Sequence, residues 1–114
     1  MSIAITCHNT AFGTAGQIEA SHLADIAAQG YKSVINNRPD GEAGPSQPKN
    51  ADIAAQAAAL GLQYVYLPVA PSAMTPAQVQ EMNRLLKTMP GPILAFCRSG
   101  ARSTNLYHLA LQLG

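Results

Sequence analysis

The sequence predicts an α/β fold built on a mainly parallel sheet. Short apolar or β-branched runs alternate with longer segments of helical period, a pattern typical of β-α-β units. Hydrophobic residues make up 47% of the 114 positions and charged residues 11%, a composition that favours collapse into a packed core. The length favours a single domain over residues 1–114, because domains usually run to roughly 100 to 200 residues.

The first third of the chain is predicted to hold two extended segments around one helix. Residues 3–7 form the first extended stretch, and residues 20–29 carry apolar side chains at helical spacing until Gly30 ends the helix. Residues 33–37 then form a strand. The segment 38–48 contains three prolines and two glycines, so it is expected to be a surface loop.

The rest of the chain continues the alternation. An alanine-rich helix is expected over residues 50–60, with Gly61 in a left-handed cap before a strand at residues 64–67. Thr75, Pro76 and Gln78 provide an N-cap hydroxyl, a proline at the first helical position and a capping-box glutamine.

The helix that begins there should end near Met89, before the Pro-Gly-Pro break at 90–92. Residues 93–96 form a continuous apolar run, as expected of a central buried strand. Residues 103–113 return to helical spacing and form the last predicted helix.

Composition and charge exclude several classes of protein. A net charge of +1 provides no basic stripe for nucleic acid, and no apolar run approaches the roughly 20 residues that span a membrane. No secretion signal is seen at the N-terminus. The two cysteines, Cys7 and Cys97, lack ligand partners at metal-binding spacing. We therefore expect a cytoplasmic protein with reduced thiols, no metal and no cofactor, and we assign no role to Cys7 or His8.

The informative segment is Cys97-Arg98-Ser99-Gly100-Ala101-Arg102-Ser103, between the last strand and the last helix. Ligands of open α/β sheets bind beyond the carboxyl ends of the strands, where turn amides and helix N-termini face the crevice. A thiolate at Cys97 would be stabilised by the helix start, by the turn amides and by Arg98 and Arg102. Cys97 is thus predicted to be a nucleophile in an anion-binding loop whose turn Gly100 permits.

The segment CRSGARS at Cys97–Ser103 resembles the active-site loop of rhodanese-type sulfurtransferases. The longer runs at 34–42, 57–69 and 91–103 resemble the small phosphatase-like domains found alone or fused to β-lactamase-fold hydrolases. This resemblance implies a three-layer α/β/α fold like that of cysteine phosphatases, with a rhodanese-like architecture as the alternative. It also implies that Cys97 is the nucleophile and Arg102 the anion-binding guanidinium. The substrate cradle would then comprise Arg98, Ser99, Gly100, Ala101 and Ser103.

Two features favour sulfur transfer over phosphoryl transfer at this stage. Similar cysteine phosphatases have five residues between the cysteine and the arginine, whereas four separate Cys97 from Arg102, which predicts a smaller cradle. The stretch 68–74 also lacks the carboxylate that serves such phosphatases as general acid. A thiolate or sulfite leaving group has little need of that proton.

We therefore expect a sulfurtransferase that moves sulfane sulfur from thiosulfate or a glutathione persulfide to a thiol acceptor, through a persulfide on Cys97. The expected partners are these small molecules and a functionally linked hydrolase or persulfide dioxygenase. The first alternative is a cysteine-dependent phosphatase, for which Asp40 or Glu42 would be a substitute acid and Arg38 a substrate-binding or supporting residue. The second is a non-catalytic oxyanion-binding module.

Overall fold

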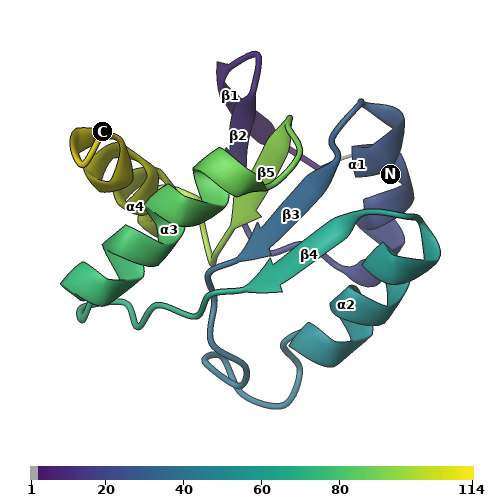
Figure 1. Cartoon of the computed structure of the whole chain (residues 1–114). Coiled ribbons are helices and arrows are strands. Elements are labelled where there is room, and N and C mark those ends of the chain that lie inside the picture. The colour runs from purple at the N-terminus through teal and green to yellow at the C-terminus, as the bar shows by residue number, and fades with distance from the viewer. Residues whose placement is uncertain (1–2) are drawn as a thin grey trace.

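The computed structural model describes residues 3–114 and has a five-stranded sheet between two layers of helices (Figure 1). The predicted α/β/α fold is confirmed. In chain order the elements are β1 (Ile5–Asn9), β2 (Phe12–Ala15), the 3₁₀ helix η1 (Ala20–His22), α1 (Leu23–Ala28), β3 (Ser33–Asn36), α2 (Asn50–Ala59), β4 (Gln63–Tyr66), α3 (Pro76–Thr88), β5 (Ile93–Phe96) and α4 (Ala101–Gln112).

The sheet has the strand order β1-β2-β5-β3-β4, and β5 therefore lies at its centre. Strands β2, β5, β3 and β4 are parallel, while β1 pairs antiparallel with β2 at one edge. Strand β2 was not predicted, because its sequence, Phe-Gly-Thr-Ala, is short and contains only one large apolar residue. All four of its residues are buried beside β5, so this strand supports the segment that follows β5.

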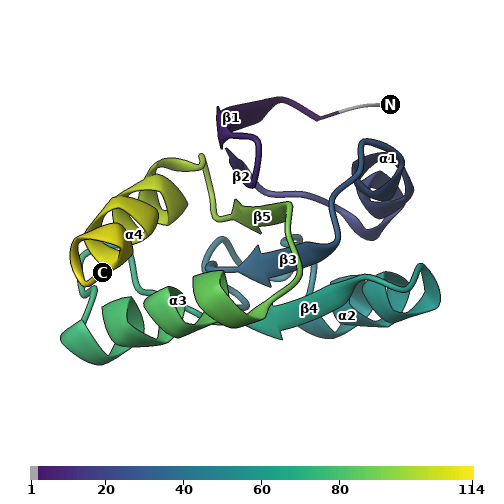
Figure 2. The ribbon, with the colours of Figure 1, turned by 45° about the horizontal axis from the view of Figure 1, so that its top comes forward.

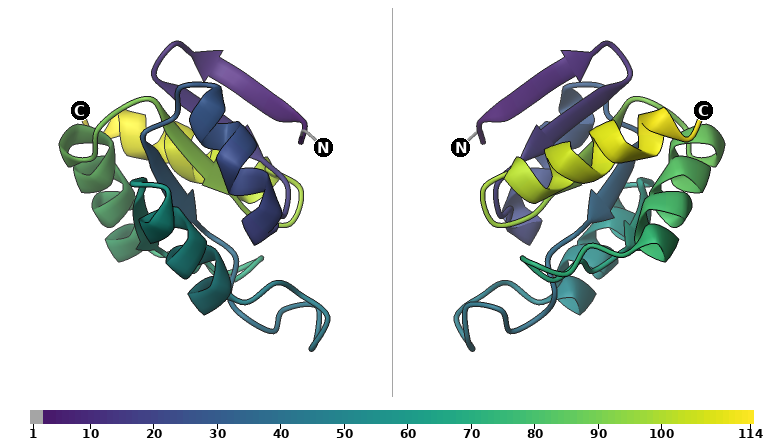
Figure 3. Two further views of the ribbon diagram at one scale, coloured as in Figure 1. Left: turned by 90° about the vertical axis from the view of Figure 1, so that its right-hand side faces the viewer. Right: turned by 90° about the vertical axis from the view of Figure 1, so that its left-hand side faces the viewer.

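Each face of the sheet is covered by one pair of helices, as the two side views show (Figure 3). Helices α1 and α2 lie over one face, where Leu23, Ile26 and Ile53 pack against Val34 and Leu94. Helices α3 and α4 lie over the other face and pack against each other, as Figure 2 also shows. Their core contains Met82, Leu85 and Leu106 from the helices with Ile35 and Ala95 from the sheet.

Local signals in the sequence set most of the helix boundaries. Gln78 N–H donates to Thr75 Oγ1 at 3.2 Å and Thr75 N–H to Gln78 Oε1 at 2.8 Å, which confirms the predicted capping box of α3. Gly61 has a φ of +76° after α2, as predicted. Helix α4 begins at Ala101, two positions before the predicted start, and therefore includes Arg102 in its first turn. Within residues 3–114, none of the helices is both long and apolar enough to cross a membrane.

Candidate active site

Cys97 directly follows β5, and the turn it begins ends at Gly100, the N-cap residue of α4. Strand β2 fixes this turn from one side: Cys97 N–H donates to Ala15 O at 3.3 Å, and Gln17 N–H donates to Arg98 O at 3.2 Å. Gly100 has a φ of +95°, and a Cβ there would lie 3.4 Å from the Ala15 carbonyl carbon. The glycine predicted to allow this turn is therefore required by its dihedral angle, whereas the contact with β2 would be an ordinary van der Waals contact.

The Cys97 sulfur lies among backbone donors at the start of α4. Gly100 N–H donates to Cys97 Sγ at 3.1 Å, and the backbone amides of Ser99 and Ser103 also favour the thiolate. Burial of the thiol raises its pKa, but these amides and the Ser103 side chain favour the thiolate more strongly, so the pKa of Cys97 is lowered overall. The lowered pKa agrees in direction with the sequence prediction, but its causes are the amides and Ser103, and the predicted contributions of Arg98 and Arg102 are not among them.

Ser103 connects the thiol to the neighbouring strand. Its side chain is completely buried and donates to Asn37 Oδ1 at 2.9 Å. Asn37 is in turn oriented by a bond from its Nδ2 to Leu67 O at 3.0 Å. The Ser103 side chain thus bonds to Asn37 and also helps to lower the pKa of Cys97.

Arg102 is held in place by a carboxylate from the loop after β3. Its Nη1 donates to Glu42 Oε1 and to Val69 O at 3.0 and 2.9 Å, and its Nη2 donates to Glu42 Oε2 at 3.0 Å. A guanidinium has five N–H donors, and these three bonds leave the Nε–H and one Nη2–H, which lie along one edge. That edge is a fork of the kind that binds two oxygens of a phosphoryl group.

Glu42 links the two candidate arginines, Arg102 and Arg38. Its Oε2 also accepts from Arg38 Nε at 3.0 Å, and Arg38 is 6% exposed. Hydrogen bonds from Arg102 and Arg38 lower the pKa of Glu42, so the carboxyl is ionised near neutral pH and is no proton donor. Glu42 therefore holds Arg102, and the alternative in which it serves as a general acid is wrong.

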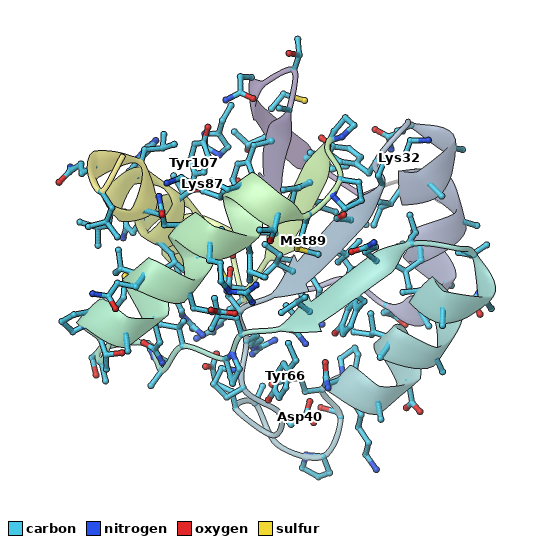
Figure 4. The ribbon with its side chains drawn as sticks, viewed as in Figure 1. Lys32, Asp40, Tyr66, Lys87, Met89 and Tyr107 are labelled. Carbon is cyan, nitrogen blue, oxygen red and sulfur yellow. The ribbon has the colours of Figure 1, made fainter. Side chains whose placement is uncertain are left out.

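Asp40 lies away from the sulfur. Its Oδ1 accepts from Asn50 N at 2.8 Å at the start of α2, and its own N–H donates to the Tyr66 hydroxyl at 2.9 Å. Figure 4 shows Asp40 and Tyr66 together on the loop side of the molecule. Asp40 lines a separate cavity with Gly44 and Lys49. The structure thus brings Arg38 to the site through Glu42 but gives Asp40 a structural contact instead.

A cavity of about 260 Å³ opens over the loop, and Cys97, 1% exposed, is among the residues that line it. The other lining residues are Pro71, Met74, Arg98, Ser99, Ala101, Arg102 and Asn105. Of the residues that the structure describes, none that lines this cavity is Asp or Glu. A second cavity of about 500 Å³ shares Pro71, Met74 and Asn105 with the first and continues past His108 and Leu109 along α4.

Two supporting features were not found from the sequence. The Glu42–Arg102 pair joins residues 60 positions apart, and no local pattern encodes such a pairing. The contribution of Gly16, just after β2, was also missed: a Cβ on this residue would lie 3.0 Å from Arg98 O, so a larger residue would force a small shift of the loop. Across the described part of the chain, no group of three or more His, Cys, Asp or Glu residues is placed to hold a metal.

Comparison with known proteins places this geometry among phosphatase-like domains. The family model described as the phosphatase-like domain of β-lactamase hydrolase-like protein matches residues 5–113. A β-lactamase hydrolase-like protein of Xylella fastidiosa is 38% identical over 102 residues, covering 90% of this chain. One of Agrobacterium fabrum is 38% identical over 95 residues, covering 83% of this chain. The chain spans only 23% and 22% of those two relatives.

Solved structures agree with this assignment. A proposed phosphatase of Neisseria meningitidis superposes with a TM-score of 0.82 at 29% identity, covering 90% of this chain and 72% of its own. TpbA of P. aeruginosa, solved in complex with phosphotyrosine, shares the fold with a TM-score of 0.72 at 18% identity, covering 96% of this chain and 65% of its own.

The predicted sulfurtransferase is therefore wrong, and with it the rhodanese-type activity and the persulfide on Cys97, because the matching family and structures are phosphatase-like. The structure supplies the physical reason. The spacing argument counted only residues between Cys97 and Arg102, but the Ser103 amide, beyond Arg102, also favours the Cys97 thiolate and lowers its pKa. A four-residue spacing therefore does not limit the number of amides in the cradle.

Proposed function

Because this chain belongs to the phosphatase-like domain family of the β-lactamase hydrolase-like proteins, we propose that it is a cysteine-dependent phosphatase. The observation that carries the proposal is the Cys97 thiol at the N-terminus of α4, where Gly100 N–H donates to its sulfur and the Ser99 and Ser103 amides help to lower its pKa. Such donors stabilise a thiolate in the resting enzyme and the oxygens of a phosphoryl group in the reaction.

In the first step, the Cys97 thiolate attacks phosphorus and forms an S–P bond while the P–O bond to the leaving group breaks and the electron pair leaves with that oxygen. The free edge of Arg102 binds two phosphoryl oxygens, and Glu42 keeps the guanidinium in that orientation. In the second step, water attacks the phosphocysteine, inorganic phosphate is released and the thiolate is regenerated.

The cavity favours substrates whose leaving group needs no proton. With no Asp or Glu among the described residues lining it, the leaving oxygen departs as an anion, which a phenolate does far more readily than an alkoxide. The adjoining cavity, with Pro71, Met74 and Leu109 in its lining, provides room for an aromatic ring. We therefore propose aryl phosphates as the substrate class, and the phosphotyrosine bound by TpbA supports this choice.

The proposal extends to the setting of the domain. The free cysteines Cys7 and Cys97 favour a cytoplasmic location, where thiols stay reduced. The relatives, more than four times the length covered here, support a functional link with a hydrolase.

The test is phosphate release from p-nitrophenyl phosphate and a phosphotyrosine peptide. We expect release by the unmodified chain and by Cys7→Ser, because Cys7 is exposed and does not line the Cys97 cavity, and no release by Cys97→Ser. Release that persists in Cys97→Ser, or no release from any aryl phosphate by the unmodified chain, would overturn the proposal.

A further inference from the structure

We propose that His8 is a positioning residue for the Cys97 loop, acting through a directed chain of hydrogen bonds that ends on the Gly100 carbonyl. Its kinetic consequence rests on the proposed phosphatase reaction, whereas its effect on the thiol does not. His8 lies on β1, two strands away from the nucleophile strand, and no sequence motif connects it to Cys97.

Three side chains form the chain of hydrogen bonds. His8 Nε2 lies 2.9 Å from Thr14 Oγ1, and Thr14 Oγ1 lies 3.2 Å from Thr104 Oγ1. Thr104 Oγ1 donates to Gly100 O at 2.8 Å. These contacts connect the edge strand β1, through β2 and the first turns of α4, to the N-cap of α4.

The direction of the chain follows from counting protons. The Gly100 carbonyl can only accept, so the single hydroxyl proton of Thr104 points at it. Thr14 must then donate its own proton to Thr104, and His8 Nε2 must donate to Thr14. With the proton on Nε2, His8 also faces Thr104 Oγ1 at 3.5 Å as a donor. This is the only arrangement that puts a proton between each close pair.

The backbone places His8 for this contact. Strands β1 and β2 pair Cys7 with Gly13 and Asn9 with Phe12, so the register shifts at His8. Irregularities of this kind redirect a side chain from the regular alternation of a strand. Thr14, at the other end of the first bond, is 2% exposed, so its hydroxyl depends on protein partners for its hydrogen bonds.

The chain acts on the peptide group that starts α4. Gly100 O accepts from both Thr104 Oγ1, at 2.8 Å, and Thr104 N–H, at 3.0 Å. Two donors on this carbonyl polarise its peptide group, whose N–H belongs to Ala101, a residue that lines the Cys97 cavity. They also fix the Gly100 backbone, whose own N–H donates to Cys97 Sγ at 3.1 Å.

The surroundings of His8 are aromatic. Its ring lies 5.8 Å from that of Phe12 and 5.5 Å from that of Tyr107, while the His108 ring meets it edge-on at 5.9 Å. Figure 4 shows Tyr107 on the side of α4 near the hairpin, where its hydroxyl accepts from Asn9 Nδ2 at 2.6 Å. Tyr107 and His108 are the titratable groups that face His8. Both the neutral Nε2–H form and the imidazolium donate from Nε2, so protonation of His8 preserves the chain.

The test compares His8→Leu, which removes the donor, with His8→Gln, which keeps a side-chain N–H. Each variant is assayed for kcat and KM with p-nitrophenyl phosphate and for the pH dependence of Cys97 alkylation by iodoacetamide, in a Cys7→Ser background. We expect His8→Leu to lower kcat by about 3- to 10-fold with a smaller change in KM, and to move the alkylation midpoint to higher pH. His8→Gln should recover most of both effects. The control is His22→Leu on η1. The His22 ring accepts a hydrogen bond from Glu19 N–H, away from the His8 chain of hydrogen bonds, so this variant should have the parental kcat and alkylation midpoint.

Two results would overturn the inference. One is a His8→Leu variant with parental kcat and alkylation midpoint. The other is a His8→Gln variant as impaired as His8→Leu, which would show that ring packing matters rather than the N–H donor. The alkylation measurement needs no phosphatase activity: an inactive parent chain whose alkylation midpoint still depends on His8 would reject the proposed function and retain the role of His8.

Discussion

The carboxylate of Glu42 holds the guanidinium of Arg102 by two parallel hydrogen bonds of 3.0 Å, with side chains that are 15% and 11% exposed. Because Glu42 occupies the Nη1–Nη2 edge of the guanidinium, the adjacent Nε–Nη2 edge is presented in a fixed orientation. Glu42, a candidate acid from the sequence, thus holds Arg102 in position.

We predict that Glu42→Gln lowers kcat/KM for aryl phosphates by about 10- to 100-fold, because it removes charged hydrogen bonds that orient Arg102. It should also destabilise the fold by about 2 kcal/mol, since Arg38 and Arg102 would be left close together without a carboxylate. Steady-state kinetics and urea unfolding measure the two effects.

Glu81→Gln is the matched control, because Glu81 pairs with Arg84 on the exposed surface of α3. Solvent screens such an exposed pair, so this variant should retain parental kinetics. Equal losses in the two variants would contradict the positioning role of Glu42.

The lowered pKa of Cys97 predicts a specific pH dependence. In Cys7→Ser, the rate of alkylation should reach its plateau at a lower pH than for an ordinary thiol, and Ser103→Ala should move the midpoint upward because one donor to the sulfur is lost. In Ser103→Ala, the acidic side of the pH profile of kcat/KM should shift upward together with the alkylation midpoint. An unchanged midpoint in Ser103→Ala would mean that the hydroxyl serves Asn37 alone.

The same pKa shift is linked to stability. Because the folded chain releases the thiol proton at lower pH than the unfolded chain, ionisation of Cys97 stabilises the fold. This contribution is complete above the unfolded pKa and is lost as the pH falls through the folded pKa. The difference in melting temperature between the parent and Cys97→Ser should therefore grow in favour of the parent as pH rises. A difference that does not change with pH would contradict the lowered pKa of Cys97.

The lack of a carboxylic acid in the cavity predicts a strong dependence on the leaving group. Across a series of substituted phenyl phosphates, kcat/KM should rise steeply as the pKa of the phenol falls, and alkyl phosphates should react at least about 100-fold more slowly. Comparable rates for phosphoserine and phosphotyrosine peptides would indicate that another group supplies the proton.

The cavity along α4 predicts where the aromatic ring binds. Leu109→Gln should raise KM for p-nitrophenyl phosphate by about 3- to 10-fold, since an apolar contact is lost, but leave KM for acetyl phosphate unchanged because that substrate has no ring. Leu113→Gln, at a leucine that is 53% exposed outside this cavity, is the control. Parallel changes for both substrates in Leu109→Gln would argue against a ring-binding role.

Gly100→Ala tests the turn itself. Its φ of +95° strains any side chain, and its N–H donates to Cys97 Sγ, so both stability and kcat should fall. Gly61→Ala carries a similar dihedral penalty at φ +76° but meets no atom within 4 Å. It should lose stability, about 1 kcal/mol, without losing kcat per folded molecule. Equal kcat values in the two variants would contradict a specific role for Gly100.

Local chemistry in the sequence accounts for much of the fold. Thr75, Pro76 and Gln78 mark the start of α3, and the apolar run at Ile93–Phe96 identifies the central strand. These signals act over a few residues, so they can be read without tertiary information. Strand β2 was not predicted from the sequence, because its burial comes from its neighbours β1 and β5 and it has few strong strand-forming residues of its own.

The candidate site was predictable in position but not in chemistry. Cys97, Gly100 and Arg102 follow from one short segment at a sheet edge. The choice between sulfur and phosphoryl transfer depended on how many amides reach the sulfur, and the spacing of Cys97 and Arg102 does not reveal the Ser103 contact. Likewise, Glu42 contacts Arg102 only because the loops after the parallel strands β3 and β5 lie at the same edge of the sheet.

The most direct test is to quench the enzyme with acid during turnover of an aryl phosphate and map the modified cysteine by mass spectrometry. The mechanism requires a phosphoryl group on Cys97 and none on Cys7. Steady phosphate release with Cys97 unmodified at every quench time, and undiminished in Cys97→Ser, would show that phosphate leaves by a route that does not pass through this sulfur.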